Sequence, residues 1–165
     1  MPGPHPDWLR PEWPAPAHVH ALFTTRAGGA SQAPYDHLNL GDHVGDDPVA
    51  VQANRQVLQA ALQSTTPGAR AVFLQQVHGA KVAALHAALP DGACADAGLS
   101  TTPGLACTIM VADCLPVLLT DTQGTVVAAA HAGWRGLAGE GGWGVLESVF
   151  KDFSALALAG KAPKA

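Results

Sequence analysis

Short apolar runs bounded by glycine, proline or polar residues recur along the chain after residue 18. Runs of this length with such boundaries are typical of buried β-strands. The pattern predicts strands at residues 19–25, 71–78, 81–85, 105–111, 116–120 and 124–130, and an irregular segment over residues 90–103.

Two other stretches have helical spacing. Asp47-Pro48 favours a helix start, because an aspartate N-cap accepts backbone N–H bonds and proline fits the first helical position. Apolar residues then fall on one face, which predicts a helix over residues 48–63. After Gly133, apolar residues from Val145 to Phe153 predict another helix.

The two ends of the chain differ from its middle. Six prolines within residues 1–17 fix many φ angles and remove backbone donors, so we expect an N-terminal arm outside regular structure. Residues 155–165 are low in complexity and are expected to form a tail. A single domain is therefore expected over residues 18–154.

Composition narrows the class of protein. Apolar residues make up 48% of the 165 residues, which is enough to bury a core. Only 13% of residues are charged, the formal net charge is −4 and Lys and Arg do not cluster, so we expect a small-molecule partner and no nucleic acid. With no secretory pattern at the N-terminus and no run of 18 apolar residues, we expect a cytoplasmic protein without a membrane span.

Three potential metal-binding or proton-transferring residues stand out: His78, Cys114 and His131, each next to an apolar run. If the strands lie side by side, their ends bring the three together at one edge of a sheet. Two imidazoles and a thiolate suit zinc or copper with a fourth position left open. Without a metal, Cys114 is a candidate nucleophile with a histidine as its base. The other two cysteines, Cys94 and Cys107, are expected to be structural free thiols.

Other polar residues are candidates for substrate or phosphate binding. Arg135 follows His131 and Gly133 in the chain, so its positive charge could bind an anion at this turn. In the alternative interpretation, Trp134 packs on the core and Arg135 pairs with an acidic residue. Asp113 interrupts an apolar stretch and therefore needs a partner or a role. The remaining candidates are Arg26, beside two glycines, and the loop residues Asn39 and His43.

Seven short motifs occur in order between about residues 20 and 139: Phe23–Ser31, Asn39–Gly41, Asn54-Arg55, Gln75–Gly79, Ala95–Ala97, Ala112–Pro116 and His131–Gly136. In this order they resemble the YfiH family, also described as the multicopper polyphenol oxidase (laccase-like) or peptidoglycan editing factor family. The resemblance implies an α/β fold with a mixed sheet flanked by helices, similar to the cytotoxic necrotizing factor catalytic domain.

The resemblance also implies a zinc site on His78, Cys114 and His131. It implies phosphorolysis or deamination of purine nucleosides, namely adenosine, inosine and methylthioadenosine, with inorganic phosphate as the second substrate. Copper-dependent oxidation of phenols is the alternative activity. A monomer or weak homo-oligomer is expected.

The resemblance weakens toward the end of the chain. Family members follow the His131–Gly136 segment with a helix and a substantial C-terminal portion that completes the sheet, whereas this chain ends at Ala165. Relative to the family it is therefore expected to be C-terminally truncated. A further alternative follows, a catalytically silent fragment in which the same three residues hold a structural metal.

Overall fold

The structure, a computed structural model, describes residues 3–160. These residues form two compact units. The first contains the described residues up to Pro14 together with His20–Arg70, and the second contains Ala15–Val19 together with the described residues from Ala71 onward. The expected single domain over residues 18–154 stays a prediction.

The first unit is built around helix α1, Pro48–Thr65, which confirms the helix predicted from the sequence. Asp47 is its N-cap, and the Asp47 carboxylate accepts a hydrogen bond from the Val49 N–H at 3.0 Å. The helix ends where the Thr66 N–H bonds to the Leu62 carbonyl. Its buried face consists of Val51, Asn54, Leu58 and Ala61.

The strand predicted over residues 19–25 is wrong. Within this segment, Phe23 forms an isolated antiparallel bridge with Leu9, through two backbone hydrogen bonds of 2.8 Å. Leu9 lies in the proline-rich arm, and prolines supply no N–H to extend the pairing into a ladder. Buried Asn54 holds the loops instead, by accepting a bond from Ala30 N–H and donating to the Asn39 carbonyl, each at 2.8 Å.

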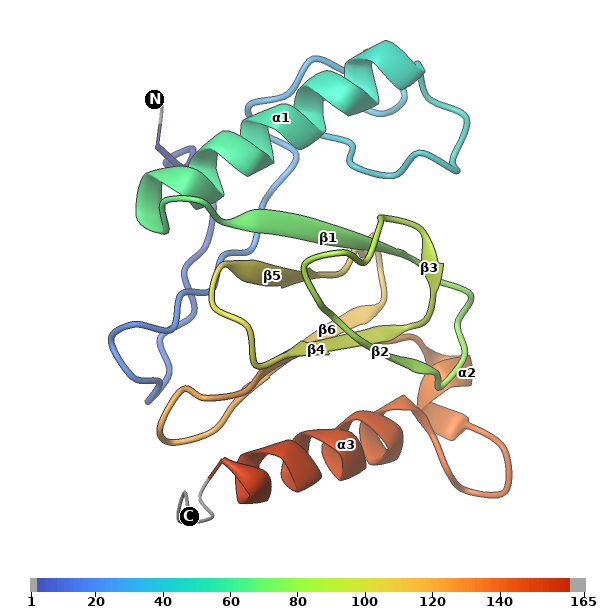
Figure 1. Ribbon diagram of the computed structural model, residues 1–165. Coiled ribbons are helices and arrows are strands. Elements are labelled where there is room, and N and C mark those ends of the chain that lie inside the picture. The colour runs from blue at the N-terminus through green and yellow to red at the C-terminus, as the bar shows by residue number, and fades with distance from the viewer. Residues whose placement is uncertain (1–2, 161–165) are drawn as a thin grey trace. The chain divides into compact units, whose positions relative to one another are not determined.

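The second unit contains the strands and two further helices (Figure 1). Its elements are β1 Arg70–Gln75, β2 Val82–Ala84, β3 Ala93–Cys94, β4 Ala97–Ser100, β5 Leu105–Thr108, β6 Leu115–Thr120, β7 Val127–Ala132, α2 Trp134–Ala138 and α3 Val145–Ala159. One sheet has the order β3-β1-β5 and the other β2-β4-β7-β6. Parallel pairs (β1 with β3, β2 with β4) coexist with antiparallel pairs (β4 with β7, β6 with β7), which confirms the predicted α/β class with mixed strands.

Helix α3 covers one face of the four-stranded sheet (Figure 1). Ala128, Ala130 and Ala132 of β7 pack in the same core as Val145 and Val149 of α3. Because successive side chains of a strand point to opposite faces, the residues between these alanines face away from α3. His131 is one of them.

The segment from residue 90 to 103 is not irregular, as predicted, but contains β3 and β4. All four residues of β4 are buried, so it lacks the polar alternation that marks a half-exposed strand. The predicted tail is wrong for residues 155–159, which belong to α3 and bury Ala157. Residues 161–165 lie outside the described residues.

A tight turn separates α2 from α3. Glu140 and Trp143 exchange backbone hydrogen bonds of 3.1 and 3.3 Å across Gly141 and Gly142. Both glycines have positive φ, 60° and 80°, as a two-residue turn of this kind requires. The Glu147 carboxylate then accepts a bond from the Gly144 N–H at 2.9 Å and starts α3. Between residues 3 and 160, the helices are too short or too polar to cross a bilayer.

Asp121 fixes the turn between β6 and β7, so it supports the register of the pair that carries two candidate site residues. Its carboxylate accepts bonds from the Thr125 and Val126 N–H groups and from the Thr125 hydroxyl. Burial alone would raise the pKa of Asp121, but these hydrogen bonds lower it overall. The folded state therefore favours the carboxylate, which gives stability that is present above the unfolded pKa of about 4 and is lost as pH falls through the lower folded pKa.

We expect Asp121→Asn to lower the free energy of unfolding by about 1–2 kcal/mol at pH 7. The difference in the free energy of unfolding between the variant and the wild type should become smaller when the pH is lowered below about 4. Urea denaturation at pH 7 and pH 3 measures both. A gap of equal size at the two pH values would contradict this role of the carboxylate.

Candidate metal centre

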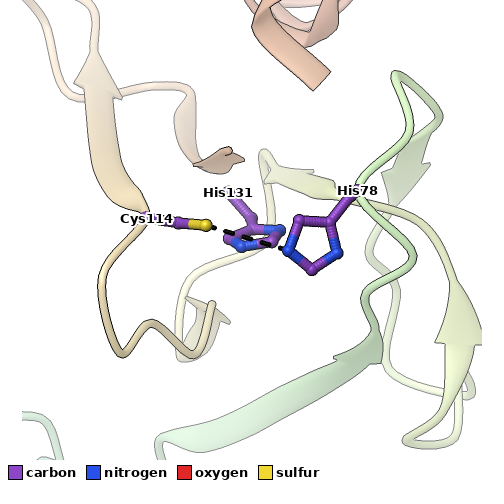
Figure 2. Close-up of side chains that lie close together, drawn as sticks. All are labelled: His78, Cys114 and His131. Carbon is purple, nitrogen blue, oxygen red and sulfur yellow. Dashed lines mark hydrogen bonds between the residues drawn. The ribbon is translucent and has the colours of Figure 1, made fainter. Parts of the chain in front are cut away.

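His78, Cys114 and His131 converge in the second unit, and their side chains point toward one another (Figure 2). Their potential ligand atoms all lie within 4.8 Å of one another. The Cys114 Sγ lies 3.8 Å from His78 Nε2, and the two imidazole rings meet edge to face with centroids 4.6 Å apart. The predicted convergence of the three residues is therefore confirmed.

The convergence does not arise at one edge of a single sheet, as the sequence predicted. The antiparallel register pairs Pro116 of β6 with His131 of β7, so Cys114, just before β6, lies at the end of the sheet where β7 finishes. His78 instead follows β1, which belongs to the other sheet. The centre therefore joins two sheets of the second unit, a pairing that depends on contacts distant in sequence.

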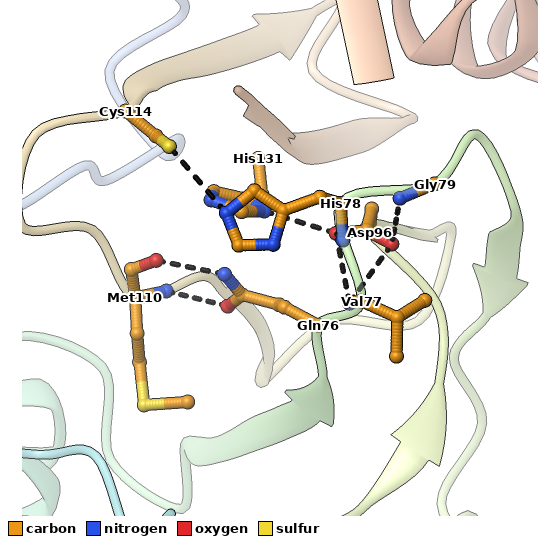
Figure 3. A network of polar contacts seen from close by, with 8 residues as sticks. All are labelled: Gln76, Val77, His78, Gly79, Asp96, Met110, Cys114 and His131. Atoms are coloured by element: carbon orange, nitrogen blue, oxygen red, sulfur yellow. Dashed lines mark hydrogen bonds and ion pairs between the residues drawn. The ribbon is translucent and has the colours of Figure 1, made fainter. Parts of the chain in front are cut away.

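A buried carboxylate, that of Asp96, organises the backbone and side chains around the centre (Figure 3). Asp96 is fully buried between β3 and β4. Its oxygens accept backbone N–H bonds from His78 and Gly79, both at 2.8 Å, and from Val77 at 3.2 Å. One of them, Oδ1, also lies 2.9 Å from His131 Nδ1.

The contact with Asp96 sets the orientation of the His131 ring. Because a carboxylate only accepts hydrogen bonds, Nδ1 carries the proton and the Nε2 lone pair is left for another partner. The backbone supports the same position, since the His131 N–H donates to the Asp96 carbonyl at 2.7 Å. A carboxylate that orients a histidine in this way is the usual outer partner of a metal ligand.

The loop that carries His78 is held at two points. Asp96 binds the three backbone N–H groups from Val77 to Gly79, and His78 itself has a positive φ of 60°, an uncommon conformation for a residue with a side chain. The Gln76 side chain exchanges two hydrogen bonds of 2.7 Å with the backbone of Met110. These bonds replace strand pairing, which explains why β1 ends at Gln75 and not at His78 as predicted.

Cys114 differs from the other cysteines in its surroundings. Partial burial, together with the negative charges of Asp113 and Asp96, raises the pKa of the Cys114 thiol. Burial raises the pKa of Cys107 to about 12, so that thiol stays protonated and unreactive at neutral pH. Cys94 is exposed, at the end of β3. All three are free thiols, as predicted.

The other predicted site residues have the following surroundings. Asp113 is exposed beside Cys114. Arg135 is exposed, and its guanidinium carbon lies 4.6 Å from the centroid of the Trp134 ring. Trp134 is itself 71% exposed, so the alternative in which it packs on the core is wrong.

Arg26, Asn39 and His43 belong to the first unit. Arg26 is exposed, and its carbonyl accepts the His37 and Leu38 N–H groups. The Asn39 side chain donates to the Asp46 carboxylate at 2.9 Å, and exposed His43 lies 3.7 Å from Asp42. Roles for these residues in binding substrate stay predictions.

Sequence reasoning missed three residues that shape the centre: Gln76, Asp96 and Gly133. A Cβ atom on Gly133 would lie 2.9 Å from His78 Cδ2 and 3.0 Å from Cys114 Sγ, so only glycine leaves both side chains in place. The signal for Asp96 was present, because a carboxylate between Ala95 and Ala97 interrupts an apolar stretch. Gln76 and Gly133 lie within the motifs Gln75–Gly79 and His131–Gly136, but their residue types do not by themselves indicate a role at a metal centre.

The three side chains fit a metal ion by their chemistry. Two imidazole nitrogens and one sulfur are ligands that zinc prefers, and three protein ligands leave one tetrahedral position open. Ligand atoms around one zinc ion are about 3.5 Å apart, which is close to the 3.8 Å between Cys114 and His78.

Comparisons with known proteins find one matching family and several similar proteins. A family described as multi-copper polyphenol oxidoreductase laccase matches residues 20–161. A protein named purine nucleoside phosphorylase from Pseudomonas aeruginosa is 56% identical over 142 residues, which are 86% of this chain and 54% of that protein. The purine nucleoside phosphorylase YfiH of Escherichia coli is 49% identical over 144 residues, 87% of this chain and 56% of its own length.

Solved structures show the same relationship. A Neisseria meningitidis protein superposes with a TM-score of 0.79 and 47% identity, covering 89% of this chain and 57% of that protein. YlmD from Geobacillus stearothermophilus has a TM-score of 0.67 and 34% identity, covering 80% of this chain and 52% of its own. The chain therefore spans about half the length of the relatives it matches.

Asp96→Asn should weaken zinc binding by about 10- to 100-fold, because the amide cannot accept from His131 and all the backbone N–H groups at once. Competition with a chromogenic zinc chelator measures the affinity. Asp91→Asn is the matched control, since the Asp91 carboxylate also accepts a backbone N–H, that of Phe73 at 3.0 Å. Equal affinities for wild type and Asp96→Asn would contradict the organising role of Asp96.

Gly133→Ala should also lower zinc affinity by about tenfold or more, because the new methyl group displaces His78 or Cys114. Gly160→Ala provides the control, since a Cβ there meets no atom nearer than 3.5 Å. The same competition assay, with a thermal melt to check folding, tests the pair. A folded Gly133→Ala protein with wild-type affinity would show that the three side chains do not share one ion.

Proposed function

The chain belongs to the multi-copper polyphenol oxidoreductase laccase family, to which the YfiH proteins belong, and we propose that it is a zinc-dependent purine nucleoside phosphorylase and adenosine deaminase. The proposed substrates are adenosine, inosine and methylthioadenosine. The observation that carries the proposal is the convergence of His78, Cys114 and His131 within 4.8 Å. The names of the relatives supply the reaction class.

The donor set favours zinc over the several coppers of a phenol oxidase. Among the described residues, one group of three or more histidine, cysteine or acidic side chains is placed to hold a metal. A single centre has too few ligands for the several copper ions that reduction of dioxygen to water usually needs. Zinc held by His78, Cys114 and His131 would supply a Lewis acid at the centre.

The proposal assigns Cys114 to the metal and not to nucleophilic attack. The carboxylates of Asp113 and Asp96 disfavour a free thiolate at Cys114, whereas a bound cation offsets their charge. His131 contributes Nε2, because Asp96 occupies Nδ1. His78 completes the set from the opposite sheet and, being exposed, also contacts substrate or water.

Phosphorolysis makes and breaks one bond at the ribose. An oxygen of inorganic phosphate bonds to C1′ as the bond from C1′ to purine N9 breaks, and the base leaves with the electron pair and takes up a proton from solvent. The exposed side chain of Arg135 is the proposed contact to the phosphate. Asp113 is the proposed contact to the nucleoside in the second unit, and substrate-binding roles for Arg26, Asn39 and His43 of the first unit stay predictions.

Deamination uses water in place of phosphate. Water adds to the purine carbon that carries the amino group, ammonia leaves, and adenosine becomes inosine. His78 orients the water in this scheme. The two reactions therefore share one centre and differ in which oxygen nucleophile is bound.

The test incubates the zinc-loaded chain with adenosine, with and without inorganic phosphate, and separates the products by chromatography. We expect adenine and ribose 1-phosphate when phosphate is present and inosine when it is absent. Cys114→Ala and His131→Ala should lower both rates by at least about 100-fold. Exposed Cys94 provides the control, and Cys94→Ala should retain full activity.

Several results would overturn the proposal. One is the absence of product from a folded chain that holds one zinc per molecule. Another is equal turnover by Cys114→Ala and wild type. Oxidation of a phenol by the copper-loaded chain, without nucleoside turnover, would support the phenol oxidase instead. If chelation lowers the melting temperature but no substrate reacts, the metal is structural.

A further inference from the structure

Trp134 is the most exposed aromatic side chain among the described residues, with 71% of its surface accessible. Tryptophan buries more apolar surface than almost any other residue when it is covered, so an exposed indole is an available contact surface. Trp134 is the first residue of α2 and directly follows Gly133. Gly133 is the residue whose backbone lies against both His78 and Cys114. Trp134 therefore directly follows, in the chain, the residue that packs against the metal centre.

One face of the indole already has a partner. The Arg135 guanidinium lies over the ring at 4.6 Å from its centroid, a cation–π distance. A guanidinium covers one face of a ring, and the high exposure of Trp134 leaves the other face accessible. The pair thus presents a flat apolar surface backed by a positive charge.

Exposed apolar residues also flank the other members of the centre in the chain. Val77 precedes His78 and is 53% exposed, and Leu115 follows Cys114 and is 56% exposed. A polar centre beside apolar surface suits a ligand with a flat apolar part and a polar reacting part. A nucleoside has this composition, because the base is flat and the ribose is polar.

We infer that Trp134 is the platform on which the purine base of the substrate stacks, an inference that rests on the proposed function. Every nucleobase has a π-face, and stacking on tryptophan is a strong and sequence-tolerant contact for it. The Arg135 guanidinium supports the indole from the opposite face of the ring. Trp134 thereby binds the base of the nucleoside, whereas the metal centre acts on the bond that reacts.

The KM for adenosine of the zinc-loaded chain tests the inference, together with the dissociation constant of adenosine for the metal-free chain, in which neither phosphorolysis nor deamination consumes the ligand. Trp134→Ala should raise the dissociation constant and the KM for adenosine by about 5- to 100-fold. Because stacking contributes equally to the bound substrate and the transition state, kcat should change little. Trp134→Phe should restore most of the affinity. Trp143→Ala is the control, since Trp143 is another exposed tryptophan, at 51%.

A ligand without a base separates stacking from general damage to the site. Ribose 1-phosphate should inhibit wild type and Trp134→Ala equally, and both should hold zinc with equal affinity. Unchanged adenosine binding in Trp134→Ala would overturn the platform while leaving the proposed enzyme intact. If Trp134→Ala lost as much affinity for ribose 1-phosphate as for adenosine, this result would also overturn the platform. Adenosine binding that depends on Trp134 in a chain without turnover would support the platform and reject the enzyme.

Discussion

The buried Asp96 carboxylate is the interaction on which the centre depends. Its two oxygens bind the backbone of the His78 loop, which extends from one sheet, and the ring of His131, which lies in the other. A buried charge is costly unless it is fully hydrogen-bonded, and here each partner that satisfies Asp96 also belongs to the centre. The same bonds therefore stabilise the fold and position two of the three proposed ligands before any metal binds.

The two faces of strand β7 have different roles: one packs against α3, and the other carries His131 of the candidate centre. Its small side chains, Ala128, Ala130 and Ala132, pack with α3 in one core. His131, at the intervening position, faces the opposite way and meets Asp96. Packing on one face of the strand thus fixes the position of the histidine on the other, without adding polar groups to the core.

Residues next to the centre in the chain expose apolar surface, whereas the centre itself consists of polar side chains. The ligand-binding side chains are held by hydrogen bonds, whereas Val77, Leu115 and Trp134 expose apolar surface next to them in the chain. Rigid polar groups suit the reacting atoms, and exposed apolar groups suit the part of a substrate that does not react. The proposed division between a metal centre and a base platform follows from this contrast. It also explains why one chain segment, from His131 to Arg135, takes part in both.

The elements with strong local signals and the residues with distinctive chemistry could be predicted before the fold was known. Helix α1 followed from the Asp47 cap and its periodicity, and the seven motifs identified the family and the convergence of His78, Cys114 and His131. Each of these signals, the helix cap and every single motif, lies within a few consecutive residues of the chain.

The folded structure established how the strands divide between two sheets, why β1 stops before His78, and that Asp96 connects the histidines. It also showed that Trp134 is exposed, where the sequence equally allowed burial. These outcomes depend on strand pairs and hydrogen bonds between residues that are not neighbours in the sequence, such as Asp96 and Gly79, which are 17 positions apart. Local pattern and propensity carry no information about such partners, because the pairing energy exists only after the chain has folded.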